Sequence, residues 1–136
     1  MQNSFFSKII ISIFAFAAIF IASAQISAHE HGAEVRKGEF VGKSDHITTG
    51  NVKVKKVANG YIVKLADNFS LDGAPAPRVG FGKDGKYDES AELGTLVSIK
   101  GKQVYVVPAS VDVSKYNEVY IWCEQFSVPL GVATLK

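Results

Sequence analysis

The stretch NVKVKKVANGYIVKLA, residues 51–66, decides the fold class. Val52 and Val54 alternate with lysines, so apolar and charged side chains point to opposite faces of an extended chain. Asn59-Gly60 follows, and two residues that tolerate positive φ are typical of a two-residue hairpin turn. The return segment, residues 61–65, alternates in the same way. The stretch therefore predicts a β-hairpin with its lysines turned outward.

The same rhythm continues on both sides of this hairpin. From Gly38 onward, Gly, Asn-Gly, Asp-Gly or Pro recurs every eight to twelve residues, and short runs rich in Val, Ile and aromatic residues lie between. This spacing predicts an all-β domain over residues 38–136, an antiparallel β-sandwich or barrel of about seven or eight short strands. A second hairpin is expected over residues 93–107, with its turn at residues 100–102 and with Val104 and Val106 alternating on the return strand.

The segment EVYIWCEQF, residues 118–126, predicts a central strand. Val119, Ile121 and Cys123 share one face, and the other face is aromatic, so both sides are apolar and need cover. The final strand carries Pro129, which has no backbone donor and favours an edge position.

The N-terminus reads as a secretory signal peptide, residues 1–24. Residues 9–24 contain fourteen apolar residues of sixteen, follow Lys8 and end in Ala22-Ser23-Ala24. Cleavage is expected after this tripeptide, with Ala28 as the second choice. The run is short for a membrane span, which needs about 20 apolar residues. We therefore expect an exported protein, in the periplasm or the medium, whose mature form does not span a membrane.

The mature chain is close to neutral. Residues 25–37 are polar and without periodicity, and are interpreted as a flexible N-terminal arm. Removing residues 1–24 takes away one lysine and leaves 14 basic and 13 acidic residues. This balance argues against a nucleic-acid binder and against electrostatic binding to lipid.

Cys123 is the single cysteine of a chain expected to meet an oxidising compartment. It cannot form an intramolecular disulfide, so it is a reactive redox thiol, a thiolate ligand to a haem or metal, a mixed-disulfide site, or a small apolar side chain in the core. Covalent haem attachment of the c type is excluded because there is no CxxCH motif.

The three histidines suggest two further sites. If cleavage follows Ala28, the mature chain begins His29-Glu30-His31, whose amine, backbone amides and third-position imidazole suit copper(II) or nickel(II) in a square plane. The alternative is a polar arm without a metal. His46 is the one histidine inside the predicted domain and could ligate a cofactor axially, the alternative being a structural role.

Residues 93–135 closely resemble the DM13 domain, and the N-terminal half from residue 38 also fits. The signature consists of a Gly-x-Leu strand, a Gly-x-Gln-x-Tyr-x-x-Pro strand, a Tyr-x-x-Val link, an Ile-Trp-Cys-x-x-Phe strand and a closing small-x-Leu strand. In this chain the five motifs are Gly94–Leu96, Gly101–Pro108, Tyr116–Val119, Ile121–Phe126 and Ala133–Leu135.

The resemblance implies an all-β domain of exported or cell-surface proteins, with electron transfer through Cys123 as a bare thiol or as the ligand of a group such as haem. It implies a redox partner, which could be a membrane-associated electron donor. The residues themselves argue against a conventional enzyme, because they show no general acid–base pair and no metal cluster with ligand spacing. Residues 73–77 depart from the family pattern, which has an acidic residue after the proline. The alternative function is a non-catalytic β-sandwich that binds a partner or ligand, with Cys123 as core packing.

Overall fold

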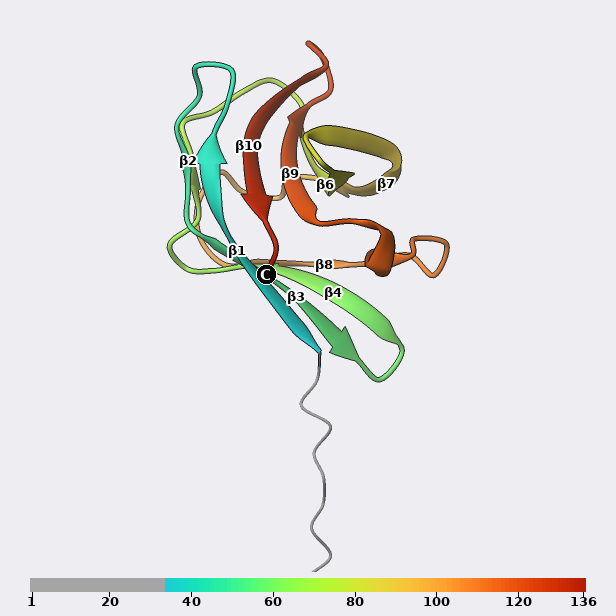
Figure 1. Ribbon diagram of the computed structural model, residues 1–136. Coiled ribbons are helices and arrows are strands. Elements are labelled where there is room, and N and C mark those ends of the chain that lie inside the picture. Colours follow the sequence, from blue (N-terminus) through green and yellow to red (C-terminus); the bar gives the residue numbers. More distant parts are fainter. Residues whose placement is uncertain (1–33) are drawn as a thin grey trace, which may run out of the picture.

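The computed structural model describes residues 34–136 (Figure 1). The predicted signal peptide, both cleavage sites, and His29 and His31 lie outside these residues. Within the described range, no helix is long and apolar enough to cross a bilayer.

Eight strands form one antiparallel sheet in the order β7-β6-β9-β10-β1-β3-β4-β8, and β2 pairs with β5 in a separate two-stranded ladder. The edge strands β7 and β8 come into contact, so the large sheet is nearly closed (Figure 1). This confirms the all-β, barrel-like prediction. The strands are β1 Val35–Gly42, β2 Thr48–Thr49, β3 Asn51–Val57, β4 Gly60–Leu65, β5 Ser70–Leu71, β6 Pro77–Lys83, β7 Lys86–Thr95, β8 Gln103–Val106, β9 Glu118–Cys123 and β10 Val128–Thr134, with one 3-10 turn, η1 Val113–Lys115.

The β3–β4 hairpin is confirmed with its predicted faces. Val54 pairs with Val63, and both are buried in the core, whereas Lys53 is exposed. The turn differs by one residue from the prediction: Val57 pairs with Gly60, so the two loop residues are 58 and 59. Gly60, with φ of 130°, supplies the positive φ as the first residue of the return strand.

The second predicted hairpin, residues 93–107, is wrong. β7 pairs with β6 and β8 pairs with β4, so the segment between them joins the two edge strands of the sheet and is not a hairpin turn. Gln103 and Tyr105 point inward, and Val104 is 50% exposed. The polar side chains can be buried because they are satisfied locally: the Tyr105 hydroxyl donates to Gln103 Oε1 (2.6 Å), and Gln103 Nε2 donates to the Ser98 carbonyl (2.7 Å).

β9 is a central strand, as predicted, between β6 and β10. Val119, Ile121 and Cys123 face the core, and Tyr120 is buried from the opposite side. The edge position expected for the last strand is wrong, because β10 lies between β9 and β1. A register shift after Pro129 accommodates the missing donor within a central strand.

The sheet begins earlier in the chain than predicted. β1 begins at Val35, so residues 35–37 of the expected arm belong to the sheet. Between β8 and β9 the chain forms η1, and the Asp112 side chain caps this turn by accepting a hydrogen bond from the Ser114 backbone N–H (3.1 Å).

Candidate functional site

Cys123 is the last residue of β9, on the inner face of the sheet. Its neighbours in register are Pro77 of β6 and Val128 of β10. The side chain is 1% exposed and belongs to the continuous apolar core. Its thiol donates a weak hydrogen bond to the carbonyl oxygen of Pro75, with Sγ and O 3.4 Å apart. The sulfur is therefore held inside the barrel, directly beneath the chain that carries Pro75.

The cover over the thiol is the β5–β6 connection, residues 72–76, which we call the cover loop. Its second half is fastened to the end of β9: the Pro75 carbonyl accepts from Cys123, and the Ala76 carbonyl accepts from the Glu124 backbone N–H (3.4 Å). Gly73 and Ala76 both have positive φ, 109° and 46°. Non-glycine residues such as Ala76 rarely adopt a positive φ. The conformation of the cover loop therefore depends on its contacts with the rest of the domain.

His46 holds the other half of the cover loop. It follows a tight turn, and its Nδ1 lies 2.8 Å from Oδ1 of Asp72. The backbone N–H of Ile47 donates to Oδ2 of the same carboxylate (3.0 Å), and the Asp72 N–H donates to the Ile47 carbonyl (3.0 Å). The Ile47 N–H first, and then the His46 ring, hold the pKa of the Asp72 carboxyl below its usual range.

The two predicted site residues inside the domain therefore contact one short loop. His46 contacts Asp72 and Cys123 contacts Pro75, three positions further along the chain. No motif in the sequence singles out Asp72 or Pro75, because their role depends on contacts with residues 26 and 48 positions away. The arrangement connects an exposed hydrogen bond between His46 and Asp72 to the cover of a buried thiol.

An aromatic cluster lies on the opposite face of β9 from the thiol. The rings of Tyr87 and Trp122 are stacked, with centroids 4.4 Å apart, and Tyr120 lies 5.6 Å from Tyr87. Gly80 and Gly82 of β6 make room for these rings, since a Cβ at Gly80 would lie 2.8 Å from the Tyr87 hydroxyl. Burial raises the pKa of both tyrosines. Trp122 is thus the chain neighbour of Cys123 and also part of a half-buried aromatic stack.

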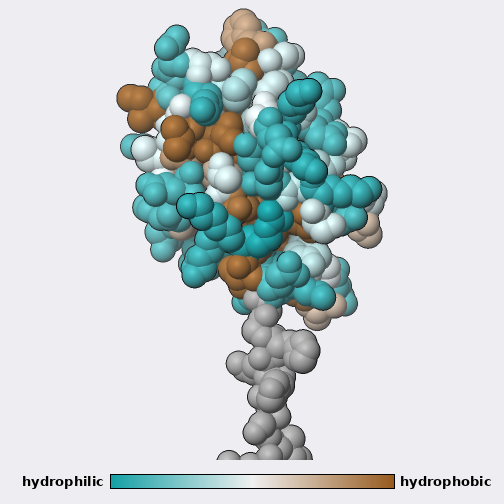
Figure 2. All heavy atoms as spheres, in the orientation of Figure 1, coloured by the Kyte–Doolittle hydropathy of each residue, from teal (hydrophilic) through white to brown (hydrophobic). Residues whose placement is uncertain are grey.

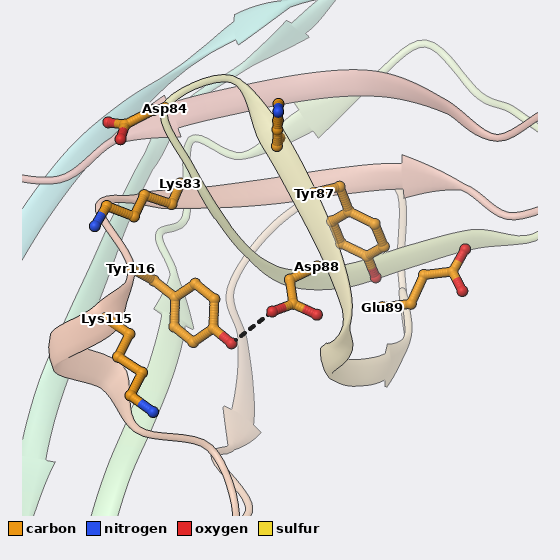
Figure 3. Close-up of a pocket in the computed structure, with 8 residues that line it drawn as sticks. Lys83, Asp84, Tyr87, Asp88, Glu89, Lys115 and Tyr116 are labelled. Carbon is orange, nitrogen blue, oxygen red and sulfur yellow. Dashed lines mark hydrogen bonds between the residues drawn. The ribbon is translucent and has the colours of Figure 1, made fainter.

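A surface hollow of about 860 Å³ lies beside this cluster, between the β6–β7 hairpin and η1 (Figure 3). The Tyr116 hydroxyl donates to Asp88 Oδ2 across it (2.8 Å). Neither Cys123 nor His46 lines it. The lining side chains are charged or tyrosine: Lys83, Asp84, Lys86, Tyr87, Asp88, Glu89, Lys115 and Tyr116.

A known protein family matches the sequence of this domain, and the matched residues include the Cys123 strand. A family described as "Electron transfer DM13" matches residues 39–135. The chain belongs to the DM13 family. No curated protein and no solved structure matches this DM13 domain closely enough to be reported.

Within residues 34–136, no three His, Cys, Asp or Glu side chains gather closely enough to hold a metal ion. His46 has one carboxylate partner and no second donor of this kind. The proposed copper or nickel site at His29 and His31 lies outside the described residues.

A haem does not fit at Cys123 in this conformation. An axial thiolate needs an open approach to the sulfur, whereas Cys123 is 1% exposed and its thiol donates to Pro75. His46 lies on the far side of Asp72 and is engaged with that carboxylate. Of the two forms in which the DM13 cysteine could act, the geometry therefore favours the bare thiol.

Proposed function

We propose that this DM13 domain is an exported electron-transfer module whose redox centre is the bare thiol of Cys123. The observation that carries the proposal is the position of the only cysteine: it lies buried beneath a loop whose other end is held by an ion pair at the surface. The family, described by electron transfer, supports a redox role.

Burial limits the chemistry that the thiol can perform. Thiol–disulfide exchange requires an attacking sulfur to reach Sγ, and the cover loop blocks that approach. One-electron exchange needs no direct contact with Sγ. Trp122, the chain neighbour of Cys123, stacks on Tyr87, so polarisable aromatic rings extend from the Cys123 strand toward the surface. In such a step the thiol loses one electron to the partner's one-electron acceptor and its proton to water that enters when the loop opens.

The cover loop gives the thiol a gated accessibility. Opening residues 72–76 breaks the Cys123–Pro75 hydrogen bond and exposes Sγ, while the Asp72–His46 ion pair opposes the opening. The electron acceptor in this proposal is a redox protein that meets the domain after export. A membrane-associated electron donor then restores the thiol by returning one electron, with a proton taken back from water.

The second candidate function is a non-catalytic binding module with Cys123 as core packing. The 1% exposure of Cys123 and its place in the apolar core favour this alternative. It differs from the first in one respect that can be measured: a packing cysteine has no redox response in the folded protein.

Thiol labelling and voltammetry of the folded protein test the proposal. Wild-type protein should react slowly with 4,4′-dithiodipyridine, and Asp72→Asn should react at least several times faster without loss of the fold. Asp112→Asn is the matched control, because Asp112 also accepts two hydrogen bonds but lies at η1. A redox wave should appear in the wild type and vanish in Cys123→Ala. A thiol that stays inert in every variant until the fold melts, or a wave that survives in Cys123→Ala, would favour the binding module.

Export belongs to the same proposal and has its own measurement. N-terminal sequencing of the protein recovered outside the cytoplasm should start at Gln25, or at His29 if the second site is used. A sequence that starts at Met1 would contradict cleavage.

A further inference from the structure

Four lysines lie directly opposite one another across four adjacent strand positions. Lys37 of β1 pairs with Lys53 of β3, and Lys53 pairs with Lys64 of β4. On the other side, Lys37 and Lys136 exchange two backbone hydrogen bonds, 2.9 and 2.8 Å long. Directly paired residues project to the same side of a sheet, so these four side chains share the outer face. We call them the lysine row.

The lysine row has no carboxylate partner. Within residues 34–136 three ion pairs form, and none of them contains a lysine. Like charges directly opposite each other on a sheet are destabilising. The sheet itself therefore gains nothing from this row, which leaves an unbalanced positive strip that an external anion can neutralise.

Aliphatic side chains lie next to the lysine row on the same face. Two residues along the strands toward the Val35 end, Val35 pairs with Lys55, Lys55 with Ile62, and Ile62 with Val106. Val35 is 38% exposed and Val106 is 74% exposed. In Figure 2, hydrophilic side chains alternate with hydrophobic ones over the lower part of the visible face, where Figure 1 places β1, β3 and β4. A groove of about 340 Å³ runs between them, lined by Val35, Lys37, Lys53, Lys55, Ile62 and Lys64.

The side-chain types on this face distinguish between anionic partners. Protein hot spots are rich in Trp, Tyr and Arg, and the recognition of nucleic-acid bases relies on Arg or on aromatic stacking. Arg36 and Tyr61 of the same strands are turned away: Arg36 donates to the carbonyls of Val113 and Tyr116, and Tyr61 packs against the core. Lysine with short aliphatic residues instead suits a lipid surface, where the ammonium groups remain at the headgroups and the apolar parts reach below them.

We infer that the lysine row and its aliphatic neighbours bind the surface of a bilayer that contains anionic phospholipid. The near-neutral net charge does not oppose this, because charges beyond about 8 Å are screened at physiological ionic strength and only the facing side counts. The inference goes beyond the proposed redox function and does not use Cys123. That residue pairs with Val128, at the opposite end of β10 from Lys136, and its side chain is buried on the inner face of the sheet, so binding through the row does not cover the thiol.

Vesicle co-sedimentation of the exported protein tests this inference. We expect binding to vesicles of phosphatidylcholine with phosphatidylglycerol, none to phosphatidylcholine alone, and a steep loss of binding as salt increases. Each lysine near an anionic surface contributes about a fivefold change in affinity, so the triple variant Lys37→Gln, Lys53→Gln, Lys64→Gln should bind about 100-fold more weakly.

A second triple variant controls for net charge. It removes three lysines that line the hollow of Figure 3, namely Lys83→Gln, Lys86→Gln and Lys115→Gln. This control should bind within about threefold of the wild type. Lys64 is partly exposed and the other five changed side chains are exposed. Circular dichroism verifies that each triple variant is folded.

Several outcomes would overturn the inference. Equal losses in the two triples would mean that net charge alone acts. Absence of binding to the anionic vesicles, with binding instead to duplex DNA or to an acidic protein, would assign the row to another partner. Cys123→Ala should bind vesicles like the wild type, so a failed redox assay and a failed vesicle assay remain distinguishable.

Discussion

Replacing Lys53 by Gln should stabilise the domain. Lys53 lies between Lys37 and Lys64 in the lysine row, so the change removes two directly opposed like-charge pairs and keeps a side chain of similar length. A cross-strand pair contributes about 0.2–1 kcal/mol, so the expected gain is about 0.5–1 kcal/mol at low salt. For a domain of roughly 100 residues this raises the melting temperature by about 3–6 °C.

Thermal unfolding at two salt concentrations measures this effect. In dilute buffer the gain should be full, and in 1 M NaCl, where the screening length falls to about 3 Å, it should nearly vanish. Lys102→Gln is the control, since Lys102 lies in the loop before β8 and has no register partner. Val54→Ala, one residue further along β3 on the buried face, should instead cost about 2 kcal/mol. A loss of stability in Lys53→Gln, or a gain unaffected by salt, would refute the like-charge argument.

Three other changes test the site. Cys123→Ser should cost only about 1 kcal/mol in urea unfolding, because the hydroxyl can donate to the carbonyl that the thiol uses; a cost above about 3 kcal/mol would contradict that hydrogen bond. The pKa of Asp72 is lowered in the fold, so its hold on the cover loop is complete above the ordinary carboxyl range and is lost as pH falls through the lowered pKa. Labelling of Cys123 should therefore accelerate in that acid window, while circular dichroism still reports a folded domain, and a flat profile would argue against the gate. Gly82→Ala should cost about 1–3 kcal/mol and alter the near-ultraviolet circular dichroism, because the added methyl falls on the Tyr120 ring; an unchanged spectrum would mean that the ring moves freely.

The fold class could be predicted because its strongest signals are local. The alternation in β3 and β4 and the two apolar faces of β9 are properties of short segments, and the structure preserves their faces. Strand pairing is not local. β8 was assigned to β7 by proximity in the chain, yet it pairs with β4, and its valines point outward because Gln103 and Tyr105 find hydrogen-bond partners in the preceding loop.

Pro129 shows why a valid rule gave a wrong position. A proline lacks the donor that a central strand needs, so an edge was the expected place. A sheet can also absorb the missing donor with a register shift, and β10 does so between Pro129 and Gly131. Residue type alone does not distinguish the two solutions, because the choice depends on which strand pairs on the other side.

The lysine row could not be predicted from the net charge, for a related reason. Net charge sums over the molecule, whereas the field near one face depends on register. Lys37, Lys53 and Lys64 are separated by 11 or more positions in the sequence, and only the pairing of β1, β3 and β4 aligns them. A one-residue change of register in either pair would direct one lysine toward the core, so the row and the buried valines are fixed by the same pairing.

The candidate site depends on the same kind of long-range contact. His46 and Cys123 are far apart in the sequence, and each could be considered only for its own chemistry. The cover loop joins them, because Asp72 and Pro75 are close enough in the chain for one short segment to meet both. Core packing explains why the thiol is buried. It does not explain why a carboxylate at the surface, that of Asp72, holds the cover loop. The His46–Asp72 contact holds one end of a loop that has two residues at positive φ, so the loop can open without unfolding the barrel. The proposed gated thiol requires such an opening, whereas a cysteine that only fills space does not.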